Sequence, residues 1–175
     1  MHAHALHNRK LGKIVTVRLL GNGDTESVAA LFDRLGPTSR ERRFHAAKPR
    51  LTSRELETLA RVDGDHHVLV AHVDGDPLPA AMARVVRDAH DRRTGEIAFE
   101  VADAYQGCGL GTQLVELLLA DARAAGIVRV DAFVQTSNRA ALGLLRRVLG
   151  APMVRVEGAE TVVAAAVYAS CTMGA

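Results

Sequence analysis

The residues best suited to chemistry surround a glycine-rich stretch, Gln106–Gly111. Its glycines stand at positions 107, 109 and 111, directly before an amphipathic segment with helical periodicity. The first turn of a helix leaves about four backbone N–H groups without partners at the positive end of the helix dipole. Glycines let phosphate groups approach those N–H groups closely. The stretch therefore predicts a site for a phosphate-bearing ligand.

Two familiar nucleotide motifs do not fit this stretch. A dinucleotide fingerprint needs Gly-x-Gly-x-x-Gly, and Gly111 falls one residue short of the third position. A P-loop needs Gly-Lys-Ser or Gly-Lys-Thr, whereas Gly111 is followed by Thr112 and Gln113. A nicotinamide-binding fold is therefore disfavoured. The spacing that fits is Gln-x-x-Gly-x-Gly, with Gln106, Gly109 and Gly111.

Two carboxylates precede the glycines on an alternating segment, residues 96–102. Alternation puts the apolar side chains on one face of a strand and places Glu96 and Glu100 together on the other. A carboxylate that faces a cleft can accept a proton directly or through a water. For Glu96 the competing interpretation is an ion pair with one of the many arginines, and for Glu100, which is closer to the glycines, it is a role in fixing the bulge there. Both are candidates for a general base.

The elements that must position these residues alternate between strand and helix patterns. Strands are predicted at residues 14–20, 67–73, 79–87, 96–102, 128–135, 153–156 and 161–168. Helices are predicted at residues 25–35, 38–44, 53–61, 110–125 and 138–149. This order predicts a single α/β domain with a mixed sheet and helices on its faces. Residues 1–12 are expected to form a flexible tail, and residues 13–175 the domain.

Composition excludes several classes of protein. Hydrophobic residues make up 48% and charged residues 24%, as in a globular domain, and a net charge of +2 disfavours nucleic acid as a partner. The chain has no apolar run of about 18 residues and no secretory leader, so we expect a cytoplasmic protein without a membrane partner. Cys108 and Cys171 lack zinc-like spacing, and the early histidines have no carboxylate nearby, so no metal is expected.

The combination of motifs resembles the GNAT superfamily of acyl-CoA N-acyltransferases. It rests on Gln106, Gly109 and Gly111, on the strand before them and the helix after them, and on Asn138 downstream. The likeness covers roughly residues 14 to 170. It implies a mostly antiparallel sheet flanked by helices, and acetyl-CoA as co-substrate. In this superfamily the glycine loop binds the coenzyme pyrophosphate, and the preceding strand pairs with the pantetheine arm.

The resemblance also implies roles for individual residues. It places the superfamily's catalytic glutamate at Glu96, so Glu96 is the first candidate for the general base and Glu100 is the reserve. It also implies that backbone groups of Val101 and Asp103 polarise the thioester and hold pantetheine. Cys108 is interpreted as a bystander to the chemistry, because no histidine lies nearby in the sequence. The residues expected to bind the coenzyme are Val101, Ala102, Asp103, Gln106, Gly107, Cys108, Gly109, Leu110, Gly111, Thr112 and Asn138.

A closer likeness rests on three segments: residues 35–44, Val62-Asp63 with His66, and residues 95–99. Together they resemble the catalytic domain of bacterial protein lysine acetyltransferases, particularly the actinobacterial kind fused to a cyclic-nucleotide sensor. No such sensor fits within these residues, so regulation by cyclic nucleotide is not carried over. A protein lysine is the expected acceptor. The alternatives are a small amine, or a sensor that binds acyl-CoA without catalysis.

The chain departs from the superfamily's pattern at Leu145, where many members have a tyrosine that protonates the departing thiolate. Either water or another group must then supply that proton, and Tyr105 and Tyr168 are interpreted as structural. Arg42, Arg43 and His45 lie where the superfamily forms one wall of the acceptor cleft. They either select an acidic or phosphorylated acceptor or form a solvated basic face.

The oligomeric state is left as monomer or homodimer. The apolar segment at residues 162–168 is a candidate for pairing across a dimer, because closing strands in such folds often end at an exposed edge.

Overall fold

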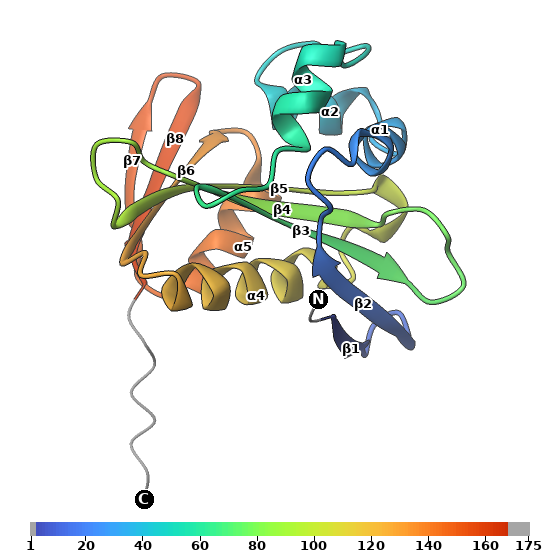
Figure 1. Cartoon of the computed structure of the whole chain (residues 1–175). Coiled ribbons are helices and arrows are strands. Elements are labelled where there is room, and N and C mark those ends of the chain that lie inside the picture. Colours follow the sequence, from blue (N-terminus) through green and yellow to red (C-terminus); the bar gives the residue numbers. More distant parts are fainter. Residues whose placement is uncertain (1–2, 168–175) are drawn as a thin grey trace, which may run out of the picture.

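The computed structural model describes residues 3–167, which form one eight-stranded sheet with helices on both faces (Figure 1). Within these residues the strand order is β1-β2-β3-β4-β5-β6-β8-β7, and only β5 and β6 run parallel. The strands are β1 (His4–Asn8), β2 (Lys13–Leu19), β3 (His66–Val73), β4 (Ala81–Arg87), β5 (Thr94–Val101), β6 (Arg129–Gln135), β7 (Met153–Glu157) and β8 (Glu160–Ala166). The helices are α1 (Thr25–Asp33), α2 (Pro37–Phe44), α3 (Ser53–Leu59), the 3-10 helix η1 (Asp103–Tyr105), α4 (Leu110–Ala124) and α5 (Arg139–Leu149). The predicted mixed, mostly antiparallel sheet flanked by helices is confirmed.

Helices cover the sheet from both sides (Figure 1). On one face α4 packs on β3, β4 and β5, and its Leu114, Val115 and Leu118 are fully buried. On the other face α1 and α3 enclose a smaller core that includes Leu31 and Val70. Each buried aliphatic side chain contributes roughly 1.5–3 kcal/mol, so both layers hold the sheet firmly. The sheet is therefore a rigid base for the residues that project from it.

The amino-terminal residues differ from the prediction of a flexible tail. His4–Asn8 forms β1 and pairs antiparallel with β2, and Leu6 packs against the larger core. His4 and His7 hide the strand pattern, because they stand in place of the β-branched residues that usually mark it. The prediction of a tail through residue 12 is wrong for these residues, which form an edge strand joined by a tight turn to β2.

The carboxyl-terminal strands also correct an expectation. β8 lies between β6 and β7, so both of its edges are paired and it is not an exposed edge strand. The edge is β7, whose five residues are all exposed. Tyr168, which we expected in the last strand, lies outside the described residues.

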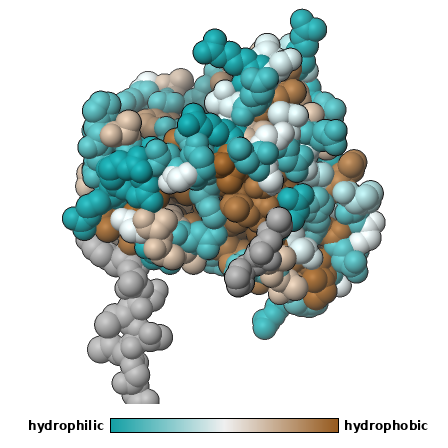
Figure 2. Space-filling model, viewed as in Figure 1, coloured by the Kyte–Doolittle hydropathy of each residue, from teal (hydrophilic) through white to brown (hydrophobic). Residues whose placement is uncertain are grey.

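Figure 2, which has the same view as Figure 1, shows a mostly hydrophilic surface with hydrophobic residues gathered in its middle and in smaller groups towards its right side. Within residues 3–167, no helix combines the length and the apolar character needed to cross a membrane. The same part of the chain holds no group of three or more His, Cys, Asp or Glu residues placed to bind a metal ion.

Candidate active site

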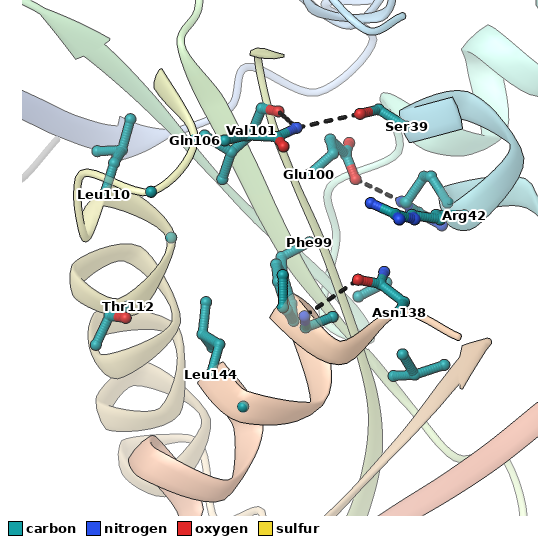
Figure 3. Close-up of a pocket in the computed structure, with 18 of the residues that line it drawn as sticks. Ser39, Arg42, Phe99, Glu100, Val101, Gln106, Leu110, Thr112, Asn138 and Leu144 are labelled. Atoms are coloured by element: carbon teal, nitrogen blue, oxygen red, sulfur yellow. Dashed lines mark hydrogen bonds and ion pairs between the residues drawn. The ribbon is translucent and has the colours of Figure 1, made fainter. Parts of the chain in front are cut away.

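The two parallel strands separate in the middle of the sheet. β5 and β6 pair over three positions that end at Glu96 and Asp131, after which β5 continues to Val101 and β6 to Gln135. We call the separated part of the two strands the fork. Backbone groups on its inner edges are left for a ligand, which can pair with them as an added strand does. The fork opens into a cavity of about 500 Å³ (Figure 3).

The glycine-rich loop lies at the open end of β5 and leads into α4. Gly107 and Gly109 have φ angles of +73° and +87°, in the region where a side chain causes strain. Gly109 is the N-cap of α4, and the first hydrogen bond of the helix runs from the Gln113 amide to the Gly109 carbonyl, at 3.1 Å. The amides of residues 110–112 precede that bond. They supply the donors that the sequence predicts for a phosphate.

Close packing, and not a positive φ, explains the glycine at position 111. A Cβ atom at Gly111 would lie 3.1 Å from Leu144 Cδ1 on α5 and 3.2 Å from Val101 Cγ2 on β5. Such contacts are tighter than ordinary van der Waals distance, so a side chain would push the helix away from both neighbours. Gly111 therefore lets the start of α4 pack closely against the fork.

Gln106 holds the loop together from within. Its Nε2 donates to the Val101 carbonyl and to Asp103 Oδ1, both at 3.0 Å, and lies 3.1 Å from Ser39 Oγ on α2 (Figure 3). Asp103 Oδ2 in turn accepts from the Gly36 amide at 3.0 Å. The side chain of Gln106 thus joins β5, η1 and α2, and fixes the loop relative to the fork.

Most of the residues predicted to bind the coenzyme line the cavity: Val101, Gln106, Gly107, Gly109, Leu110, Gly111, Thr112 and Asn138. Three others do not lie in its lining. Ala102 is buried, the Asp103 amide donates to the Arg34 carbonyl at 3.2 Å, and Cys108 Sγ donates to the Tyr105 carbonyl at 2.7 Å. Because the Asp103 amide already has an acceptor, it is not available to polarise a thioester in this structure.

Glu96 and Glu100 lie on the same face of β5, as alternation predicts, but their surroundings differ. Glu100 lines the cavity and accepts from Arg43 Nε at 2.5 Å, in an ion pair whose side chains are 15% and 17% exposed. Glu96 is exposed at the inner end of the fork, next to Ile97, which lines the cavity. Glu100 therefore has a structural partner, whereas the Glu96 carboxylate faces solvent.

Arg84 adds a positive charge beside these carboxylates. It lies on β4 opposite Ala98, between the positions of Glu96 and Glu100, and its Nη2 donates to the Thr58 carbonyl at 3.2 Å. Burial lowers the pKa of Arg84 and the nearby Arg43 lowers it further, while the two glutamates act in the opposite direction. An arginine stays charged despite such shifts, so Arg84 provides a fixed cation behind both carboxylates.

Helix α2 spans the open end of the fork through polar contacts. Gln135 Nε2 on β6 donates to the Glu41 carbonyl at 3.1 Å, and His45 Nδ1 lies 2.9 Å from Glu160 Oε1 on β8. On the β5 side the Arg43 ion pair completes the attachment. No residue of α2 is fully buried, and Arg42 lines the cavity. Of the three basic residues singled out in the sequence, two are therefore paired with carboxylates.

Tyr105 belongs to a small charged cluster behind the loop. Its hydroxyl donates to Asp76 Oδ2 at 2.7 Å, and Arg34 Nη2 lies 2.6 Å from the same oxygen. The Arg34 hydrogen bond, supported by Tyr105, lowers the pKa of Asp76 to about 2. The bond to Asp76 also raises the pKa of Tyr105. Through this hydrogen bond Tyr105 connects its own segment to those of Asp76 and Arg34, which agrees with the structural role expected for it.

Asn138 and Leu145 define the second helix at the cavity. Asn138 is the N-cap of α5, and its Oδ1 accepts from the Ala141 amide at 3.2 Å (Figure 3). Leu145 is fully buried between α5 and the sheet. The position where many GNAT enzymes carry a tyrosine is therefore part of the hydrophobic core.

Sequence reasoning missed several residues that line the cavity. Lys10 comes from the β1–β2 turn, Phe133 from β6, and Arg139 and Arg147 from α5. Phe133 is 45% exposed and shares a face with Asp131, the partner of Glu96. These positions carry no motif, because each depends on contacts between segments far apart in the chain.

The comparisons with known proteins agree with this geometry. Residues 29–151 match the acetyltransferase (GNAT) family, so the chain belongs to that family of acyl-CoA-dependent N-acetyltransferases. It is 38% identical over 115 residues to acetyltransferase Pat of Mycolicibacterium smegmatis, covering 65% of this chain and 34% of that protein. It is 28% identical over 132 residues to an acetyltransferase of Pseudomonas aeruginosa, covering 74% of this chain and 70% of the relative. The chain thus spans about a third of the length of the M. smegmatis protein.

Solved structures resemble the fold as a whole. The GNAT domain of S. lividans PAT has a TM-score of 0.84 and 25% identity, over 94% of this chain and 96% of that domain. A cAMP-binding acyltransferase from Mycobacterium smegmatis has a TM-score of 0.69 and 28% identity, over 98% of this chain and 49% of that one. yncA from Salmonella typhimurium, solved with its cofactor acetyl-CoA, has a TM-score of 0.61 and 21% identity, covering 92% of this chain and 98% of its own.

Proposed function

We propose that this chain transfers an acetyl group from acetyl-CoA to the side-chain amine of a protein lysine, with Glu96 as the general base. The observation that carries the proposal is the fork. The glycine-rich loop and the start of α4 lie at its open end, and Glu96 lies at the point where β5 and β6 separate. The proposed base therefore lies on the same strand, β5, that leads into the proposed donor-binding loop.

Each part of the fork has a task in this reaction. Acetyl-CoA, when bound, supplies a thioester whose carbonyl carbon is attacked by an uncharged amine. The amides at the start of α4 hold its phosphates, and the inner edge of β5 offers backbone groups to the pantetheine arm. Glu96 removes the ammonium proton, directly or through a water. Because Leu145 is buried and Tyr105 is bound to Asp76, water is the proposed source of the thiolate's proton.

The surroundings of Glu96 favour a lysine on a protein over a small free amine. Sites for small molecules are usually enclosed, whereas Glu96 lies at the surface, outside the lining of the cavity. A lysine side chain can reach such a position from the surface of another protein. The half-exposed ring of Phe133, on the same side as Asp131, offers an apolar surface for the methylene groups of the lysine.

The test is acetylation of lysine peptides and of small amines by the native chain and by Glu96→Gln, followed by mass spectrometry. We expect peptide turnover to fall by roughly 10²–10⁴-fold in Glu96→Gln, because the base is lost. Calorimetric affinity for acetyl-CoA should change by less than about twofold, since the phosphate contacts remain. Glu100→Gln is the comparison variant, because it removes the other candidate carboxylate from the same face of the same strand, and it also breaks the ion pair with Arg43.

The outcomes separate the alternatives. A loss of turnover in Glu100→Gln that exceeds the loss in Glu96→Gln would transfer the role of base to Glu100. Turnover of free amines without turnover of any peptide would identify a small-molecule enzyme instead. Binding of acetyl-CoA with no turnover of either class would make the chain a sensor.

A further inference from the structure

The β1–β2 turn brings a lysine to the glycine loop. Lys10 lines the cavity, and its Nζ lies 3.3 Å from the carbonyl oxygen of Gly107, a residue 97 positions further along the chain. The lysine belongs to the segment that the sequence predicts to be a flexible tail. Its position suggests a function for that segment.

The turn that carries Lys10 is fixed against α4. Asn8 is 2% exposed, and its Oδ1 accepts from the amides of Lys10 at 3.1 Å and Leu11 at 3.0 Å. Asn8 Nδ2 donates to Gln113 Oε1 at 2.7 Å, and Gln113 Nε2 donates to the His7 carbonyl at 3.3 Å. Gln113 is in the first turns of α4. The backbone of Lys10 is therefore held at a set position relative to the amides at the start of this helix.

The loop has a charge requirement that it does not meet by itself. A pyrophosphate carries full negative charges, whereas helix amides offer only partial positive charge. Residues 103–113 contain no lysine or arginine, and Asp103 is negative. Among the described residues, the cations that line the cavity are Lys10, Arg42, Arg43, Arg139 and Arg147. Arg43 is paired with Glu100, and Lys10 has a contact with the loop.

We propose that Lys10 binds the pyrophosphate of the coenzyme and completes the glycine loop with a full positive charge. The ammonium group has three donors, of which the Gly107 carbonyl uses one. Lysine commonly acts as a point charge at phosphate sites, and its flexible stem allows the small movement needed. The inference rests on coenzyme binding at this loop, and it assigns the β1–β2 turn to the donor site.

The experiment is calorimetric titration of acetyl-CoA into the native chain, Lys10→Met and Lys13→Met. Lys13 is the matched control, since it belongs to the same hairpin, lies outside the cavity lining, and has its Nζ near Gly75 of the β3–β4 turn. We expect Lys10→Met to bind about tenfold more weakly, because a hydrogen bond to a charged group is lost. Lys13→Met should stay within about twofold, and Lys10→Arg should recover part of the affinity.

Two further measurements make the assignment specific. The loss in Lys10→Met should persist with 3′-dephospho-acetyl-CoA, which keeps the pyrophosphate, and should shrink when the salt concentration is raised to about 0.5 M. Thermal unfolding of Lys10→Met should match the native curve, which separates a lost contact from a damaged fold.

Several results would overturn the inference. Native affinity in Lys10→Met would show that the lysine makes no contact with the coenzyme. A loss that disappears with the 3′-dephospho compound would assign Lys10 to the 3′-phosphate instead. An equal loss of affinity in Lys13→Met would show that the effect comes from the total positive charge of the hairpin and not from a contact of Lys10. Absence of binding by the native chain would contradict the donor itself, which is a different failure.

Discussion

The two sides of the fork differ in whether backbone groups or side-chain contacts form them. On the donor side, the loop between β5 and α4 presents backbone amides, and glycines at positions 107, 109 and 111 set its shape. On the proposed acceptor side, α2 is attached by side chains, through Arg43–Glu100 and His45–Glu160. A site made of backbone is specified by consecutive residues, whereas a site made of side chains is specified by contacts between distant segments.

The largest expected effect is on the donor side. Gly109→Glu should abolish measurable calorimetric binding of acetyl-CoA, which means a loss of affinity of at least about 100-fold, or about 2.8 kcal/mol at about 1.4 kcal/mol per tenfold. The reason is that a side chain at φ +87° strains the loop and adds a negative charge beside the phosphates. Gly126→Glu is the control, since Gly126 has a φ of +81° just beyond the other end of α4. A control variant that also fails to bind would attribute the loss to backbone strain alone.

An intermediate effect is expected on the acceptor side. Arg43→Met leaves Glu100 without its partner and loosens α2, so the KM for a lysine peptide should rise by about tenfold, as expected for a charged hydrogen bond. The affinity for acetyl-CoA should stay within about twofold. Steady-state kinetics and calorimetry on the same variant measure the two quantities.

The pair can be isolated by adding Glu100→Gln to Arg43→Met. If the ion pair acts as a unit, the double variant should be no worse than the worse single variant. A parallel fall in coenzyme affinity would contradict the division of the fork into two independent sides.

The smallest effect concerns the cluster behind the loop and is seen in stability. Asp76→Asn should lower the free energy of unfolding at pH 7 by roughly 1–3 kcal/mol, because it removes a charged acceptor from Arg34 and Tyr105. The folded-state pKa of Asp76, about 2, lies below the value near 3.9 of an unfolded chain, so its contribution is present above pH 4 and is lost as the pH falls towards 2.

Denaturant unfolding at a series of pH values measures this contribution. The difference between the native chain and Asp76→Asn should narrow between about pH 4 and pH 2. A difference that stays constant across this range would show that Asp76 stabilises the fold through its neutral form.

The same contrast explains what the sequence could predict. The glycine loop, the N-cap at Asn138 and the placement of Glu96 with Glu100 on one face follow from local rules, and the structure has each of them where expected. The end of β5–β6 pairing at Glu96 depends on strands that are distant in sequence. So does the contact of Lys10 with Gly107.

Two errors share this physical cause. β1 is a strand because β2 supplies its hydrogen bonds, although its histidines give it little strand propensity. β8 is an inner strand because β7 folds back beside it, and no local pattern distinguishes the two. The sequence leaves an arginine partner open for Glu96, whereas the structure pairs Arg43 with Glu100, because the fold alone selects which arginine meets which carboxylate.

The continuity of β5 has one more consequence. Five residue steps separate Glu96 at the inner end of the fork from Val101 beside the loop, which at about 3.3 Å per step makes a distance of roughly 17 Å. If the glycine loop holds the phosphates and Glu96 is the base, as proposed, the strand sets the distance between the phosphates and the reacting carbon. The length of the arm that carries the thioester would then select the donor, and the adenosine beyond the phosphates would contribute affinity without setting the position of the reaction.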